Sequence, residues 1–307
     1  VYKRQHLIYS SPATLAFNSP GAEGFGVKRA GLAVPDSVML IVSPGCCGRN
    51  TSVLSSMRAY QDRFYYLLMD ETDIVTGRHL KKIPKAVAEI CEGLKKKPSV
   101  VMICITCVDA LLGTDMERVC HKAEEYAGVP VRPCYMYALT REGRKPPMVH
   151  VRQSVYSLLE PKKKKGNVVN LLGYFSPLTD DCELYDLLHG AGVKTIHEIS
   201  RCKDYAQYQT MSEANFNLVL HPEARFAAED FHDRLKIPYI ELRRLYQIDK
   251  IASQYRAFAA ALGVEFEDEI PRKAAEEAVE KFREIHPDAV FAVGEWMNGD
   301  PSVSYTH

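Results

Sequence analysis

Residues 38–49 read VMLIVSPGCCGR, and residues 100–107 follow the same plan as VVMICITC. In both segments a short, unbroken apolar run leads directly into cysteines. Apolar runs of this length are typical of strands buried on both faces of a parallel sheet. Such sheets bind ligands at the carboxyl ends of their strands, beside the point where the strand order reverses. If the two strands are neighbours, four thiols meet at one edge of the sheet.

These thiols belong to Cys46, Cys47, Cys104 and Cys107, which we predict to be metal ligands. Four converging thiolates favour an iron–sulfur cluster. Cys104 and Cys107 have the Cys-x-x-Cys spacing that lets two sulfurs reach one metal centre. A redox-active dithiol has the same spacing but normally begins a helix, whereas Cys104 still belongs to the strand. A zinc site is a further alternative, although zinc sites usually contain two such pairs.

The chain must reverse direction at the adjacent pair Cys46 and Cys47 if both thiols are to reach one cluster. Neighbouring residues of an extended chain point to opposite sides. Pro44 and Gly45 precede the pair and allow the chain to reverse. The simpler interpretation is one ligand and one buried thiol. The other cysteines have no partner at ligand spacing or lie in predicted helices and strands, and we expect them to behave as small hydrophobic residues.

Composition limits the classes of partner. The chain has 307 residues, of which 46% are hydrophobic and 25% charged, and its 39 basic and 39 acidic residues balance. We therefore expect an ordinary globular protein that binds neither nucleic acid nor membrane surfaces. No apolar stretch approaches the roughly 20 residues that span a bilayer, and no leader is evident, so we expect a cytoplasmic location. Nine cysteines are then expected to be free or metal-bound rather than paired in disulfides.

Strands alternate with helices along the chain, which predicts parallel βαβ units. We expect an α/β fold of tandem Rossmann-like domains, each with a parallel sheet flanked by helices, and a truncated third domain. The run of lysines at 161–166 is predicted to be a solvated linker. The expected segments are a first domain at 6–165 with the cysteine turns, a second at 166–286, the start of a third at 287–302, and adaptor-derived ends at 1–5 and 303–307.

The expected secondary structure follows from apolar spacing and capping residues. Strands are predicted at 38–42, 67–69, 100–104, 129–131 onward, 168–172, 194–199, 217–220, 237–240 and 289–293. Helices are predicted at 53–66, 79–96, 115–126, 182–189, 224–235, 246–262 and 271–285.

His221 follows the strand predicted at 217–220 and precedes a helix. A histidine there more often caps a helix, yet a cleft opens at such a strand end, so His221 is a candidate cofactor-binding residue. The chain has no Walker-type loop, and residues 21–26 lack dinucleotide-binding spacing. If ATP drives the chemistry, it binds another protein.

In order and spacing, several motifs resemble those of the nitrogenase component 1 family of oxidoreductases. That family includes subunits of the molybdenum–iron protein, its cofactor-assembly scaffold, and reductases of tetrapyrroles. The resemblance covers nearly all of residues 13–300. The motifs that carry it are PGCCG at 44–48, DIVTG at 73–77, CVDALLGTD at 107–115, VNLLGYF at 169–175 and IPY at 237–239.

The resemblance implies that Cys107 and Cys47, or Cys46, ligate an iron–sulfur cluster of the 4Fe-4S type or larger at a subunit interface. It implies two partners: a homologous component 1 subunit, in a homo- or heteromeric dimer or tetramer, and an ATP-hydrolysing iron protein that donates electrons. A second metallocofactor or a tetrapyrrole is a further candidate ligand. The family's upstream cysteine is absent from residues 17–26, and Cys104 is a candidate replacement.

His221 aligns with the thiolate that holds the catalytic cofactor in true nitrogenase, so the resemblance does not imply dinitrogen reduction. We expect an oxidoreductase subunit whose cluster passes electrons from the iron protein to a substrate or cofactor. The alternative is a non-catalytic scaffold for metallocofactor assembly. A thiol redox or zinc-binding module is the third hypothesis.

Overall fold

The computed structural model describes residues 26–45, 58, 60–105, 112–135 and 145–290. Cys46, Cys47 and Cys107 lie outside these residues, as do the proposed adaptor-derived ends. Most of the expected third domain also lies outside them. Within the described residues, no helix is long and apolar enough to cross a bilayer.

The first sheet contains β1 (Val38–Ser43), β2 (Phe64–Leu68), β3 (Val101–Ile105) and β4 (Val131–Tyr135). All pairs are parallel, and the order is β2-β1-β3-β4. The strands β1 and β3 are therefore neighbours, with Ile41 opposite Cys104. The strand order reverses between them, which meets the condition set for the two segments to end at one edge of the sheet.

Helices cover both faces of this sheet. On one face α6 (His79–Gly93) and α8 (Met116–Ala127) pack against Leu40, Val42 and alternate residues of β3. On the other face α3 (Val27–Gly31) and α9 (Pro147–Tyr156) pack against Met39, Ile41 and the intervening residues of β3. Every residue of β1 and β3 is buried, because alternate side chains enter opposite cores.

The second sheet repeats the plan of the first. It contains β5 (Val168–Leu172), β6 (Thr195–His197), β7 (Phe216–Val219) and β8 (Tyr239–Glu241), all parallel in the order β6-β5-β7-β8. One face packs on α10 (Glu183–Gly190) and α13 (Ile248–Leu262). The other packs on α11 (Tyr205–Gln209) and α12 (Arg225–Leu235). The strand order reverses between β5 and β7, so the fold contains two equivalent edges at which ligands can bind.

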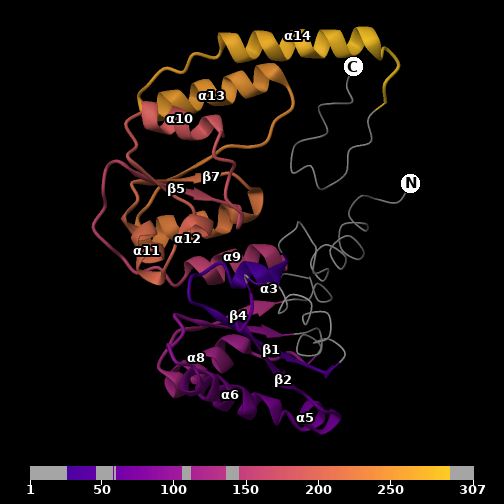
Figure 1. Ribbon diagram of the computed structural model, residues 1–307, viewed down its shortest axis with the longest axis vertical. Helices are drawn as coiled ribbons and strands as arrows, with labels where there is room; N and C mark the ends of the chain where they lie inside the picture. The colour runs from indigo at the N-terminus through magenta and orange to yellow at the C-terminus, as the bar shows by residue number, and fades with distance from the viewer. Residues whose placement is uncertain (1–25, 46–57, 59, 106–111, 136–144, 291–307) are drawn as a thin grey trace.

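The two sheets share a core. Figure 1 shows α3 and α9 of the first unit stacked against α11 and α12 of the second. The rings of Tyr156 and Phe231 lie 5.3 Å apart across this contact, and the Tyr208 hydroxyl donates to the carbonyl of Val155. The last helix, α14 (Glu269–Ile285), lies beyond α13, and none of its residues is buried.

The structure corrects the prediction for the segment before β2. The helix expected at 53–66 is wrong over its described residues, because residues 58 and 60–63 are not helical and Phe64 to Tyr66 belong to β2. Aromatic residues fit the pleated edge of a sheet well, and Asp62 at φ 61° makes the turn before the strand. The polar stretch after β2 is helix α5 (Glu71–Thr76), which begins with a capping box formed by Asp70 and Asp73.

Other differences concern short elements and the linker. Helices α3, α9 and α11 were not predicted, and residues 289–290 of the expected last strand are not in a strand. The lysine-rich linker is partly anchored rather than fully solvated. Lys164 Nζ donates to the carbonyl of Ser212 at 2.6 Å, and Lys165 pairs with Glu213.

We expect Phe231→Ala to lower the free energy of unfolding by about 3–5 kcal/mol, because the side chain is fully buried between the two units. The matched control is Phe226→Ala on the same helix, where the ring is 41% exposed and lies under the Lys145 ammonium. This control should lower the free energy of unfolding by about 1 kcal/mol or less. Chemical denaturation measures both values, and equal losses would contradict the shared core.

Candidate functional site

The first candidate site lies where β1 and β3 end. Ser43, the last residue of β1, is fully buried, and its carbonyl accepts a hydrogen bond from Met69 N at 3.0 Å. Cys46, Cys47 and Cys107 follow these strand ends in the sequence. The strands themselves are adjacent and parallel, so they end side by side. The convergence of these thiols itself stays a prediction, because the three cysteines lie outside the described residues.

Cys104 is the one described member of the predicted ligand set. Its side chain is fully buried and lies in the core between the sheet and helices α3 and α9. Burial raises the pKa of this thiol to about 11, while the charge of Lys28 acts in the opposite direction. The thiol is therefore protonated at neutral pH. Its role as a replacement ligand stays a prediction, and this burial weighs against it.

The remaining described cysteines behave as expected for small hydrophobic residues. Cys91, Cys120 and Cys134 are buried, and burial raises the pKa of each thiol. Cys134 lies opposite Cys104 in the β3–β4 pairing. Among the residues that the structure describes, no three His, Cys, Asp or Glu side chains form a group that could hold a metal ion.

A buried carboxylate beside the first site was missed by the sequence analysis. Asp73 is 1% exposed, and its oxygens accept from Lys82 Nζ and Arg78 Nε, both at 2.7 Å. These two hydrogen bonds hold the pKa of Asp73 well below its usual range. The network fixes the junction between α5 and α6 in the motif at 73–77. The pattern Asp-x-x-Asp at 70–73 is a capping-box signal that could have revealed it.

The second candidate site lies where β5 and β7 end. His221 is 3% exposed, and its Nδ1 accepts a hydrogen bond from Glu223 N at 3.2 Å. It caps the short helix η4 (Pro222–Ala224), and its ring meets that of Tyr174 edge-on at 5.6 Å. Burial, followed by the charges of Arg152 and Arg244, lowers the pKa of His221 to about 3. The imidazole is neutral at physiological pH, and with Nδ1 as acceptor its proton is on Nε2.

Gly173 makes the close approach of the two strand ends possible. It has φ 136°, and a Cβ at this position would lie 2.7 Å from both the backbone N and the Cβ of His221. Leu220 N donates to the carbonyl of Leu172 at 2.8 Å, just before this contact. A side chain at position 173 would separate the strands, so glycine is required there.

Arg152 holds the second site together from α9. It is 3% exposed, and its Nε and Nη2 donate to the carbonyl of Gly173 at 3.0 and 2.7 Å. Its Nη1 donates to the carbonyl of Met148 at 2.9 Å and to Glu223 Oε2 at 2.6 Å. The sequence analysis missed this residue because it did not predict α9.

The outer side of the second site is cationic. Arg244 is exposed, and its Nη2 lies 3.5 Å from the Tyr174 hydroxyl. The charges of Arg244 and Arg152 both act on the His221 imidazole. Glu223 pairs with Arg152 and lies 3.8 Å from His221 Nδ1, so the exposed Arg244 is the cation beside the imidazole that could attract an anionic group.

The family model described as "Nitrogenase component 1 type Oxidoreductase" matches residues 23–291. Two curated relatives carry the name nitrogenase iron-molybdenum cofactor biosynthesis protein NifE. The protein from Nostoc sp. is 27% identical over 239 residues, which cover 75% of this chain and 49% of that protein. The protein from Klebsiella pneumoniae is 25% identical over 309 residues, which cover 94% of this chain and 66% of that protein. The chain thus spans about half to two thirds of these relatives.

Two solved structures have the same fold. One, titled "Nitrogenase Cp1 at pH 6.5", has a TM-score of 0.58 and 18% identity over 86% of this chain and 61% of that chain. The other, "Nitrogenase Cp1 at pH 5", has a TM-score of 0.54 and 20% identity over 85% and 55%. They support the tandem α/β architecture.

We expect His221→Gln to flatten the pH dependence of stability. The pKa of His221 is about 3 in the folded chain and about 6.5 when unfolded, so the unfolded state binds more protons between these values. The stability that this residue contributes is complete above the unfolded pKa and falls as pH drops toward the folded one. The wild type should lose up to about 1.4 kcal/mol more per pH unit than the variant.

Denaturation at several pH values between about 4 and 6 measures this difference. His150, whose pKa burial lowers to about 4, is present in both proteins and cancels. The control is His232→Gln, at an exposed position. Parallel stability curves for the wild type and His221→Gln would contradict the buried, neutral state of this imidazole.

Proposed function

The chain belongs to the nitrogenase component 1 type oxidoreductase family, and from this premise we propose that it is a scaffold subunit for metallocofactor assembly. In this proposal an iron–sulfur cluster binds beside the first sheet, and a metallocofactor or its precursor binds beside the second. The supporting observation is the repeated strand order: β1 and β3, which the proposed cysteine ligands follow in sequence, flank one reversal, and β5 and β7, which precede the second site, flank the other.

The first site fits an iron–sulfur cluster in its donor chemistry. Cys107 and Cys47, or Cys46, follow two adjacent parallel strands, and thiolates are the ligands that such clusters prefer. We propose these residues as the ligands. A bound cluster would supply low-potential electron transfer, and the buried Asp73 network would keep the neighbouring α5–α6 junction rigid.

The second site would hold a metallocofactor by a hydrogen bond and by charge, whereas a thiolate site would hold it by a bond to the metal. Because His221 Nδ1 accepts from Glu223 N, the proton of the neutral imidazole is assigned to Nε2, which makes this atom a hydrogen-bond donor rather than a metal-binding lone pair. We propose that His221 donates to an anionic atom of the cofactor. Arg152 positions His221 through Gly173 and Glu223, and Arg244 adds positive charge.

This difference favours the scaffold over the electron-transferring enzyme. Hydrogen bonds and charge hold a cofactor less firmly than a metal–thiolate bond, and a scaffold must release what it assembles. The printed names of the curated relatives, cofactor biosynthesis proteins, also support this choice. An oxidoreductase subunit that reduces a substrate other than dinitrogen is the second candidate, because the matched family is named for oxidoreductases.

We propose that the partners bind beside the first site. Leu68, Val75 and Leu112 are 59%, 84% and 48% exposed and offer apolar surface for a partner. A cavity of about 610 Å³ between the α5–α6 junction and the start of α8 is lined by cations such as Lys81 and Arg118. This surface suits a homologous component 1 subunit or an ATP-hydrolysing iron protein with acidic groups.

Anaerobic purification tests the cluster. We expect a coloured protein with iron and acid-labile sulfide, and we expect Cys107→Ala to lose most of both because a cluster ligand is removed. Cys202→Ala is the matched control, because that half-buried thiol lies outside both sites. Equal iron in the two variants, or a colourless wild type, would refute the ligand assignment.

A transfer assay separates the scaffold from the enzyme. We expect the cofactor-loaded complex to pass its cofactor to a cofactor-free acceptor protein, with no sustained substrate reduction when the iron protein and ATP are added. The variant Arg244→Gln should retain less cofactor than the wild type, because positive charge beside His221 is lost. Sustained multiple turnover without release of the cofactor would establish the enzyme instead.

A further inference from the structure

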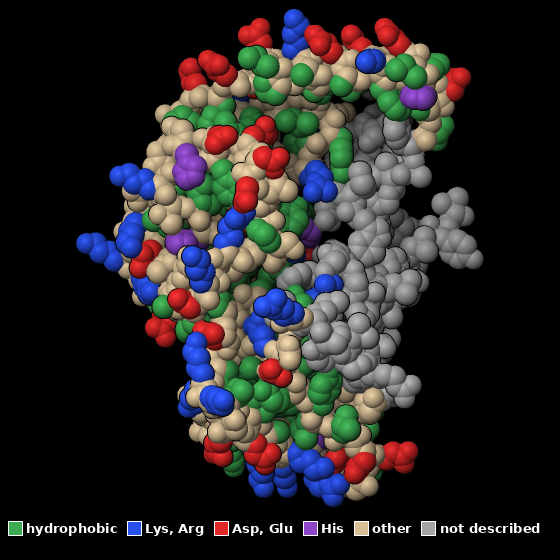
Figure 2. Space-filling view, in the orientation of Figure 1, with side chains coloured by type: hydrophobic (Ala, Val, Ile, Leu, Met, Phe, Trp, Pro, Cys, Tyr) green, Lys and Arg blue, Asp and Glu red, His purple; other side chains and the backbone are tan. Residues whose placement is uncertain are grey.

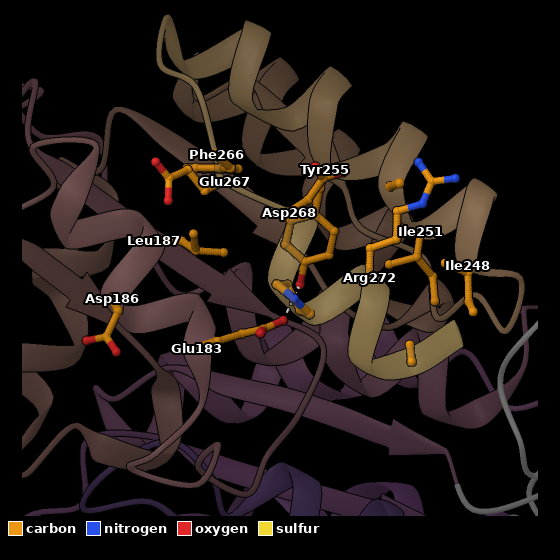
Figure 3. Close-up of a pocket in the computed structure, with 13 residues that line it drawn as sticks. Glu183, Asp186, Leu187, Ile248, Ile251, Tyr255, Phe266, Glu267, Asp268 and Arg272 are labelled. Atoms are coloured by element: carbon orange, nitrogen blue, oxygen red, sulfur yellow. Dashed lines mark hydrogen bonds between the residues drawn. The ribbon is translucent and has the colours of Figure 1, made fainter. Parts of the chain in front are cut away.

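A cavity of about 350 Å³ lies between α10, α13 and the first turns of α14 (Figure 3). None of its lining residues belongs to the two sites described above. Its volume lies at the lower end of the range of small-molecule sites. The wall contains apolar side chains from all three elements and the segment before α14: Leu187, Ile248, Ile251, Phe266, Pro271 and Ala275.

Two aromatic rings form one side of this cavity. Tyr255 and Phe266 meet edge-on, with ring centroids 6.5 Å apart. The Tyr255 hydroxyl donates to Glu183 Oε1 at 2.8 Å, as the dashed line in Figure 3 marks. The ring faces therefore remain as apolar surface while the hydroxyl is satisfied. Aromatic faces attract organic cations as well as apolar groups.

The charge around the cavity is negative. Its lining includes the carboxylates Glu183, Asp186, Glu267 and Asp268. Arg272 is the one Lys or Arg among the lining residues, and its guanidinium is paired with Asp249 at 2.9 Å and Glu276 at 3.0 Å. Figure 2 shows further Asp and Glu side chains along α14. An anionic ligand would be repelled here.

Asp268 is the residue that points to a specific kind of ligand. It occupies the N-cap position of α14, yet its side chain makes no capping hydrogen bond. Its Oδ2 is shielded from solvent and has no hydrogen-bond partner among the described residues. A carboxylate oxygen in this state is costly, and a donor supplied by a ligand would remove the cost.

We propose that this cavity binds a small organic ammonium ion with an apolar body. The ammonium group donates to Asp268, with Glu267 and Asp186 adding negative charge, and the apolar body packs against Tyr255, Phe266 and the aliphatic wall. Arg272 already opposes part of the Asp268 charge, but Asp268 Oδ2 still lacks a hydrogen bond, which an ammonium group would supply. A bare metal ion fits less well, because no group of three potential His, Cys, Asp or Glu ligands occurs in the described part of the chain.

Three related probes test this proposal by calorimetry or ligand-observed NMR on the 307-residue chain. They are 2-phenylethylammonium, the uncharged 2-phenylethanol and the anionic 3-phenylpropionate. We expect the ammonium ion to bind about tenfold or more tightly than the alcohol, because the alcohol can still donate a hydrogen bond but has no positive charge to pair with the carboxylate, and we expect the anion not to bind. Higher salt should lower the affinity for the ammonium ion only moderately, because its contact with Asp268 is partly buried.

Variants locate the binding. Asp268→Asn should lower the affinity for the ammonium ion about tenfold or more. Ala275→Leu should lower the affinity for both the ion and the alcohol, because the larger side chain fills the cavity. The matched control is Glu280→Gln, which removes one charge from an exposed position of α14 outside the cavity. It should change the affinity by about twofold or less. Thermal unfolding of each variant checks that it is folded.

Several outcomes would overturn the proposal. They include no binding of the ammonium ion at millimolar concentration, equal binding of the alcohol, and an affinity that neither Asp268→Asn nor Ala275→Leu changes. A concentration-dependent mass that Ala275→Leu abolishes would also overturn it, because the cavity would then be a contact between copies of the chain. The cluster and cofactor proposals stand or fall separately, since no residue is shared.

Discussion

The buried guanidinium of Arg152 joins the two halves of the molecule at one point. It extends from α9, which packs on the first sheet, to the carbonyl of Gly173 and the carboxylate of Glu223 at the ends of the second. A charge that is 3% exposed must be paired or hydrogen-bonded, and here Glu223 and two backbone carbonyls satisfy it. The position of His221 follows, because Gly173 and Glu223 are its direct neighbours.

The repeated strand order of the two sheets links the fold to the proposed function. Two parallel sheets with the same strand order produce two reversals, and each lies between its central strands, at whose carboxyl ends open α/β sheets bind ligands. The proposed cysteine ligands follow the first pair of strands in sequence, and the neutral His221 lies at the end of the second pair, beside Arg152, Glu223 and Arg244. A third, acidic cavity lies under α14, away from both. We therefore propose a different class of ligand for each place, although the net charge of the chain is zero.

Much of the fold could be predicted because its strongest local signals are also its tertiary determinants. The central strands β1 and β3 are continuous apolar runs over Val38–Val42 and Val101–Ile105, and only a strand covered on both faces can bury them. Weaker signals failed where packing overrides local preference. Phe64 to Tyr66 lie in an edge strand rather than a helix, and α9 was missed because it is buried almost all round and lacks an amphipathic period.

The sequence by itself determined the parallel α/β class, the family resemblance that the family match confirms, and the position of His221 after a strand end. Only the tertiary structure decided what the candidate site residues can do. It placed Cys104 in the core with a raised pKa, and it held His221 neutral, with Nδ1 accepting a hydrogen bond. The physical reason is that pattern and spacing are local properties of a chain. Burial, charge and hydrogen-bond partners are set by residues distant in sequence, such as Arg152, that folding brings together.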